Sequence, residues 1–103
     1  MNRAAAAAAL QRALELSQEL VTVAESGDVE EVIRLDAERL RLLKSARPVL
    51  QPLSPADRSM LRAIADLNAR SLGRLEHRFR AKCRDLDMLA ARRRAVRAYA
   101  HHR

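Results

Sequence analysis

Few side chains in this sequence have both the type and the spacing that catalysis or metal binding requires. His77 stands alone, and the acidic pairs within residues 30–31 and 85–87 are explained by helix capping and surface charge. Cys83 is the single cysteine, which excludes a disulfide framework and a thiolate metal cluster. A glycine-rich phosphate loop, an HExxH motif and a nucleophile elbow are all absent from the sequence. We therefore predict a protein that is not an enzyme and has no cofactor.

The C-terminal segment carries the remaining candidates for chemistry. His101 and His102 could hold a metal only weakly, and we predict no metal site there. Residues 74–103 contain ten Lys/Arg and three Asp/Glu, a net charge of +7, whereas residues 1–73 contain ten of each. Such a basic segment suggests an acidic partner, a nucleic acid or a membrane surface, and the alternative is a solvated arginine-rich helix face. The densest group is expected to steer acidic partners: Arg92, Arg93, Arg94 and Arg97.

The elements that position these residues are predicted to be helices. The 103 residues suffice for one domain, residues 1–103, and are rich in alanine, leucine, arginine and glutamate, with 2% aromatic residues. Apolar residues recur at steps of three and four in residues 4–25 and 29–46, which predicts two helices. Gly27 suits a helix end with positive φ, and Asp28 suits the start of the next helix. The fold class is therefore all-α, an antiparallel helical hairpin with a long third helix, as a bundle of three or four helices.

The third helix is expected to extend beyond the hairpin. Three prolines exclude helix from residues 47–55, where apolar residues predict packing against the end of the bundle. Ser54 and Asp57 have the spacing of a capping box, and Gly73 is the one residue that clearly weakens helix from residue 56 to 98. A straight helix over residues 56–98 would be about 65 Å long, against about 33 Å for residues 4–25. Either the third helix overhangs the hairpin or it breaks, with residues 87–91 as the candidate break.

No segment is predicted to cross a membrane. The N-terminal MNRAAAAAAL is only weakly apolar and is interrupted at once by Gln11 and Arg12, unlike a signal peptide. We therefore expect a cytoplasmic protein without membrane insertion.

Two further interpretations of the basic, leucine-rich sequence stay open. A nucleic-acid or transcription accessory protein could use residues 74–103, although stacking aromatics and a recognised DNA-binding motif are lacking, which does not favour it. A self-associating coiled coil without a client, such as a homodimer, is the second.

Within residues 29–46, Asp36 and Arg39 can pair either as a rim salt bridge or as a polar group inside a partner-binding groove.

Several segments in order resemble one known family. LELSQELVTVAESGDVEEVIRLDAERLRLL, residues 14–43, resembles the first two helices of the FliT family of flagellar type III export chaperones. The family pattern of Gly-Asp, acidic residues and then a leucine–acid–arginine–leucine helix corresponds here to Gly27-Asp28, residues 30–31 and residues 35–43. LRAIADLNARSLGRL at residues 61–75 resembles the third helix, and RRRAVRAYA at residues 92–100 resembles the basic ending.

The resemblance implies a helical-bundle chaperone that binds the filament-cap protein FliD before export by the flagellar type III apparatus. It also implies contacts with the export ATPase or export gate, and in enteric bacteria with a master transcription activator. This chain looks shorter at its C-terminus than the enteric members, which argues against a separate autoinhibitory fourth helix and against the regulatory role. We predict a partner-binding groove between the second and third helices: Leu35, Arg39, Leu42, Leu61, Ile64 and Asn68. The tail residues Leu89, Val96 and Tyr99 are predicted to cover this groove or to contact export components.

Overall fold

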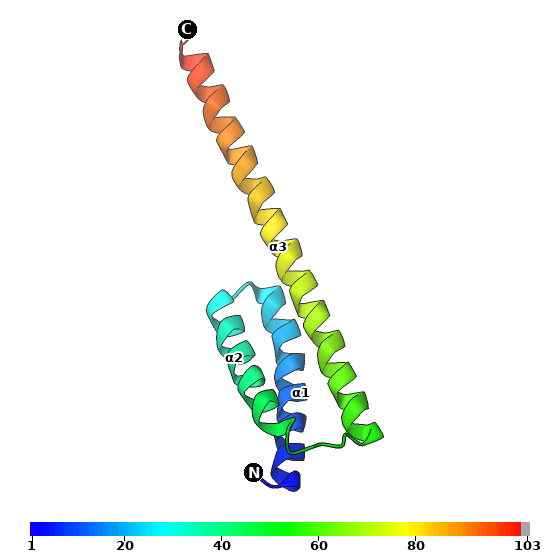
Figure 1. Cartoon of the computed structure of the whole chain (residues 1–103). Coiled ribbons are helices and arrows are strands. Elements are labelled where there is room, and N and C mark those ends of the chain that lie inside the picture. Colours follow the sequence, from blue (N-terminus) through cyan, green and yellow to red (C-terminus); the bar gives the residue numbers. More distant parts are fainter. Residues whose placement is uncertain (102–103) are drawn as a thin grey trace.

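The computed structural model describes residues 1–101 and contains three helices in that range, joined by a short turn and a proline-rich linker. They are α1 (Arg3–Ser26), α2 (Val29–Ala46) and α3 (Pro55–His101). Figure 1 shows α1 lying between α2 and the first half of α3, with the second half of α3 extending far beyond both. The predicted all-α hairpin with a long third helix is confirmed. His102, half of the terminal histidine pair, lies outside the described residues.

The turn between α1 and α2 forms as the sequence predicts. Gly27 has φ +77°, and its N–H donates to the carbonyl of Val23, which ends α1. The Asp28 carboxylate accepts a hydrogen bond from the N–H of Glu31 at 3.1 Å and so caps α2. Two local interactions of this kind reverse the chain within two residues and set α2 antiparallel to α1.

Helix α1 is the centre of the molecule because most of its length is covered from two sides. Its buried residues include Ala6, Ala13 and Ala24, each with no exposed area, and Leu16. Small residues at these positions allow both neighbouring helices to approach closely. α1 packs against α2 and against α3, whereas no Cα atom of α2 lies within 8 Å of a Cα atom of α3 in residues 1–101. The molecule is thus two helix pairs that share α1.

The linker closes one end of the bundle. Leu50 is fully buried, and Val49 and Leu53 pack against the same apolar cluster, as expected for an apolar linker. Ser54 and Asp57 form the predicted capping box: the N–H of each donates to the side chain of the other at 3.1 Å. Helix α3 therefore starts beside α1 at a defined residue, Pro55.

Helix α3 is continuous from Pro55 to His101, so the break considered at residues 87–91 does not occur. Gly73 lies inside the helix with no atom within 4 Å of the position a Cβ would take. Residues 79–101, called here the overhang, run past the end of α1 (Figure 1). The described residues extend 76 × 21 × 18 Å along the three principal axes of the molecule.

Candidate partner-binding surface

Helices α2 and α3 both pack against α1, but their backbones stay apart from each other. The surface between them, with α1 beneath it, is where the sequence predicts a partner-binding groove. The floor is apolar and consists of two buried clusters, one around Leu10 and Ile64 and the other around Leu16 and Leu35. We call this feature the α2–α3 groove.

One polar bridge crosses the α2–α3 groove. Arg39 Nη2 donates a hydrogen bond to Asn68 Oδ1 at 2.7 Å, and the same nitrogen pairs with Asp36. The Arg39 side chain is only 7% exposed, whereas that of Asp36 is 43% exposed, so the pair joins a buried guanidinium to a carboxylate at the surface. Among the described residues, Arg39 Nη1 is buried without a hydrogen-bond acceptor. The bridge therefore places a desolvated positive charge in the groove, still able to donate to a further acceptor.

The other residues predicted for the groove lie mostly beneath it. Leu35 and Ile64 are 1% and 5% exposed and belong to the two core clusters. Leu42 packs against both clusters and Leu61 against the first, and both are half-buried. Arg39 and Asn68 are thus brought together as expected, while the four apolar residues mainly hold the helices on α1. Their contact with a partner stays a prediction.

The accessible apolar residues of α2 are a neighbouring set that the sequence-based prediction missed. Val29, Ile33 and Leu40 are all exposed, with Ile33 at 63%. They share a helical stripe with Asp36, which pairs with the bridging Arg39 and so belongs to the side of α2 nearer α3. Leu72 on α3 is also exposed, and it lies four residues after Asn68 on the same face. Two apolar stripes on α2 have equally regular helical periods in the sequence, so periodicity did not single out the exposed one. They are Val29, Ile33, Leu40 and Leu43, and beside them Val32, Leu35, Leu42 and Ala46.

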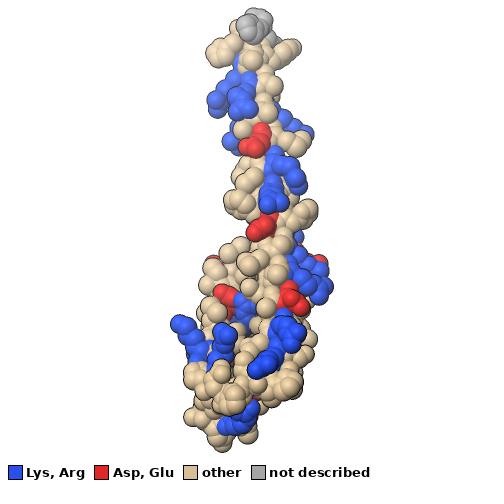
Figure 2. Space-filling view, turned by 45° about the vertical axis from the view of Figure 1, so that its right-hand side comes forward, with Lys and Arg blue, Asp and Glu red and all other residues tan. Residues whose placement is uncertain are grey.

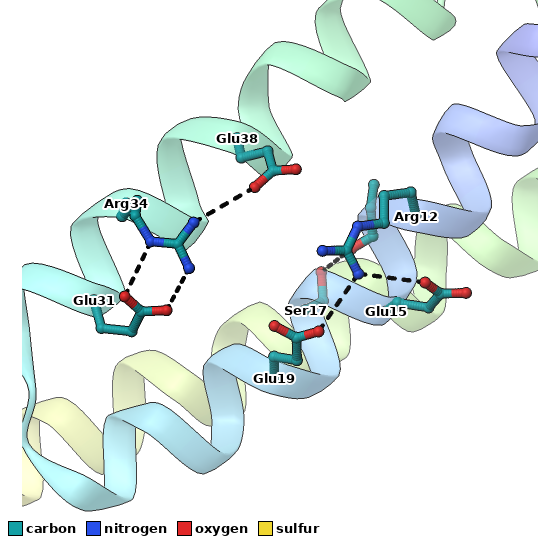
Figure 3. A network of polar contacts seen from close by, with 8 residues as sticks. Arg12, Glu15, Ser17, Glu19, Glu31, Arg34 and Glu38 are labelled. Atoms are coloured by element: carbon teal, nitrogen blue, oxygen red, sulfur yellow. Dashed lines mark hydrogen bonds and ion pairs between the residues drawn. The ribbon is translucent and has the colours of Figure 1, made fainter.

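The opposite side of α2 is polar. Arg34 donates to Glu31 and pairs with Glu38, while Arg12 on α1 pairs with Glu15 and Glu19 (Figure 3). The hydrogen bond from Arg34 lowers the pKa of Glu31 and raises the pKa of Arg34 itself. These ion pairs are solvent-exposed and contribute little to stability. Their position leaves the α3 side of α2 as its apolar, accessible side.

The overhang is exposed along most of its surface. Leu89, Val96 and Tyr99 are all exposed, so these predicted tail residues do not cover the groove in this conformation. Lys and Arg side chains recur along the overhang, whereas acidic side chains are sparse (Figure 2). The four predicted steering arginines, at residues 92–94 and 97, are exposed on it.

A metal site and a membrane span each set requirements on the side chains and helices of the described part of the chain. Residues 1–101 contain no cluster of three or more side chains that could hold a metal ion. None of the described helices is both long and apolar enough to cross a membrane. The described surface carries exposed apolar residues on α2 and α3 and a basic helical extension.

The described residues form an elongated, all-helical molecule, which defines its class as a small helical protein. Comparison with family models defines that class further: the model described as Flagellar protein FliT matches residues 7–101. The chain therefore belongs to the FliT family, a family of non-enzymatic chaperones, and membership implies a role in flagellar export. Comparisons with curated proteins and with solved structures give no match.

Proposed function

We propose that this chain acts in the cytoplasm as the export chaperone of the flagellar filament-cap protein, FliD, and delivers it to the type III export apparatus. The FliT family assignment supports a chaperone role. The observation that carries the assignment of the binding site is the exposed apolar stripe beside the buried Arg39–Asn68 bridge. An amphipathic client helix would lie in the α2–α3 groove with its apolar face on Ile33, Leu40 and Leu72.

The bridge suits such a client for a physical reason. Helix ends and disordered segments carry unsatisfied backbone carbonyls, and the Arg39 Nη1 group lacks an acceptor in the described residues. A client carbonyl or carboxylate at that point would satisfy both groups. A client that is disordered before binding loses conformational entropy when it folds into the groove, which keeps the complex releasable at the export apparatus.

Export components would meet a different part of the molecule. In this proposal the overhang, with Leu89, Val96 and Tyr99 exposed, is free to contact the export ATPase or export gate while the groove holds its client. The basic residues at 92–94 and 97 would accelerate binding to an acidic surface at low ionic strength.

The test is binding of purified cap subunit to variants of exposed groove residues. Ile33→Asp and Leu72→Asp should each weaken binding by about tenfold or more, since an ionised carboxylate would be desolvated against the client. Met88→Asp is the matched control, because Met88 is a comparably exposed apolar residue on the overhang. It should bind as wild type does.

Exposed positions are preferable to Leu42 for this experiment, because Leu42 packs on both core clusters and its replacement would disturb the fold. Circular dichroism should give the same helicity for all three variants. Equal affinity of Ile33→Asp, Leu72→Asp and wild type for the cap subunit would remove the α2–α3 groove as the client site.

A further inference from the structure

The overhang continues the face of α3 that packs on α1. Ile64 and Ser71 are the buried residues of α3, and Leu75 follows on the same face as a half-buried residue. Continuing this face at helical spacing gives five exposed residues, called here the seam: Lys82, Leu86, Leu89, Arg93 and Val96. A helix packed along the seam would occupy the space directly beyond the end of α1.

The seam is fixed relative to the bundle by two arginines. Arg74 Nη1 lies 2.6 Å from Glu25 Oε1 and 3.3 Å from the carbonyl oxygen of Val21. Arg78 Nη1 donates to the carbonyl oxygen of Glu25 at 2.5 Å. The Arg78 bond satisfies a carbonyl in the last turn of α1, and together these contacts anchor α3 where it leaves the bundle.

A hollow lies at this junction. It has a volume of about 470 Å³ and is lined by residues from the α1–α2 turn, from α2 and from α3, among them Gly27, Val29, Leu75, Phe79, Lys82 and Asp85. Val29 and Phe79 are both largely exposed. The hollow is continuous with the start of the seam through Lys82, so it can receive the end of a helix that lies along the seam.

The seam mixes apolar and positively charged residues. Leu86 and Val96 are 64% and 68% exposed, which is more apolar surface than a helix in water normally presents on one face. Lys82 and Arg93 lie in the same face, and neither has an ion-pair partner within residues 1–101. Residues 79–101 contain seven Lys/Arg and two Asp/Glu, so the overhang has a net charge of +5.

The positions of Lys82 and Arg93 in the seam favour one kind of binding partner over a second copy of the chain or a membrane surface. A second copy packed antiparallel would bring Lys82 opposite Arg93, and a parallel copy would bring each against itself, so both pairings place like charges in the interface. A helix that lies on an anionic membrane keeps its basic residues on the flanks of an uninterrupted apolar face, whereas here they interrupt it. A helix with leucines and acidic residues on one face satisfies both the apolar and the charged members of the seam.

From this geometry we infer that the seam is a docking site for an acidic amphipathic helix of a partner protein, which packs on α3 as an extension of α1 and ends in the hollow at the α1–α2 turn. The site lies on α3 beyond the α2–α3 groove and includes Leu89, Arg93 and Val96, which the proposed function assigns to contacts with export components. The inference rests on that part of the proposed function, whereas its peptide test is independent of cap-subunit binding.

The test uses the full chain and three synthetic helical peptides of the same leucine pattern. The residues flanking the leucines are Glu in one peptide, Gln in the second and Lys in the third. Fluorescence anisotropy should give at least about tenfold tighter binding of the Glu peptide than of the Gln peptide, and weakest binding of the Lys peptide. The Glu peptide should also slow alkylation of Cys83, the single cysteine, which is half-buried near the seam.

A pair of double variants locates the site. K82E/R93E should lose at least about tenfold in affinity for the Glu peptide and gain affinity for the Lys peptide, because the charge of the seam is reversed. R80E/R84E changes the net charge equally on the opposite face of the helix and should retain wild-type affinity within about twofold. Circular dichroism of both variants checks that the helix is intact.

The opposite results would overturn the inference. Equal losses in the two double variants would show attraction to net charge rather than docking on the seam. Failure of the Glu peptide to bind would mean that no acidic partner helix docks on the seam. Tighter binding to vesicles of anionic phosphatidylserine would assign the seam to lipid. A dimer in sedimentation equilibrium whose dissociation constant changes in K82E/R93E but not in R80E/R84E would assign it to a second copy.

Discussion

Arg39 on α2 and Asn68 on α3 are joined by a hydrogen bond of 2.7 Å, although the backbones of the two helices do not come close to each other. The bond connects residues 29 positions apart and joins the two helices that flank α1. Because the Arg39 side chain is almost fully buried, its charge depends on Asp36 and Asn68 for compensation. The stability of the fold should therefore be sensitive to which partner is removed.

Asn68→Ala should destabilise the chain more than Arg39→Met does. Removing Asn68 leaves a buried guanidinium with fewer acceptors, which costs about 1–3 kcal/mol. Arg39→Met removes the buried charge itself and keeps an unbranched side chain of similar length, so the loss should be smaller. Urea denaturation of both variants at constant m-value measures the difference. If Arg39→Met lost more free energy of unfolding than Asn68→Ala, the arginine would make a net stabilising contribution that exceeds the cost of burying its charge.

The two glycines should respond to alanine in opposite directions. Gly27→Ala forces a Cβ into positive φ, which costs about 1–2 kcal/mol. That Cβ would also lie 2.8 Å from Arg78 Nε and displace the arginine from the end of α1. Gly73→Ala should instead stabilise α3 by about 1 kcal/mol, because its Cβ would meet no atom within 4 Å. Thermal melts followed by circular dichroism test both signs, and a stabilised Gly27→Ala would contradict the turn geometry.

The small residues of α1 should tolerate enlargement only on the exposed face. Ala13 has no exposed area within the first core cluster, so Ala13→Leu should overpack the contact between α1 and its neighbours and cost about 1–3 kcal/mol. Ala8→Leu, at an exposed position of the same helix, should leave the free energy of unfolding within about 0.5 kcal/mol of wild type. Chemical denaturation of the two variants compares them directly. Similar losses in both would argue against α1 as the buried centre.

The capping box at the start of α3 should make stability depend on acid pH. Hydrogen bonds from the backbone and side chain of Ser54 lower the pKa of Asp57 below its ordinary value. The folded state thus binds fewer protons than the unfolded state, so this contribution is present above pH ~4 and is lost as the pH falls toward the lowered pKa. Asp57→Asn should reduce stability at neutral pH and flatten this part of the pH profile.

A charge-matched control separates capping from net charge in that experiment. Asp66→Asn removes one negative charge at an exposed position of α3 and should keep the wild-type change of stability between pH 5 and about pH 3. Denaturation midpoints across this range provide the measurement. If Asp57→Asn and wild type lost stability in parallel, the capping carboxylate would not be the titrating group.

Local signals in the sequence predicted the elements well. The Gly27–Asp28 turn and the Ser54–Asp57 capping box depend on residues three or fewer positions apart, and both formed as expected. Helix α2 has the predicted bounds, and α1 differs from its prediction by one residue at each end. The start of α1 was missed because Asn2 was not considered as its cap, although its side chain accepts a hydrogen bond from the N–H of Ala5.

Nonlocal packing limited the prediction of the candidate site. On α2, two neighbouring apolar stripes have equally good helical periods, and only the contact with α1 decides that Leu35 is buried and Ile33 exposed. For the same reason Ile64 was assigned to the groove although it lies in the core. The Arg39–Asn68 bond could not be derived from spacing along one helix. Both residues had been selected as polar members of apolar faces, and their role in partner binding stays a prediction.

The length of α3 also governs how this protein behaves in solution. The radius of gyration of 21.2 Å is far above the value of about 13 Å expected for a compact chain of 100 residues. A monomer of 11.6 kDa with this shape will diffuse slowly and elute early from a size-exclusion column, at the position of a much heavier sphere. Elution volume alone would therefore overstate the mass of a monomer. Multi-angle light scattering, which reports mass independently of shape, is the appropriate way to count chains.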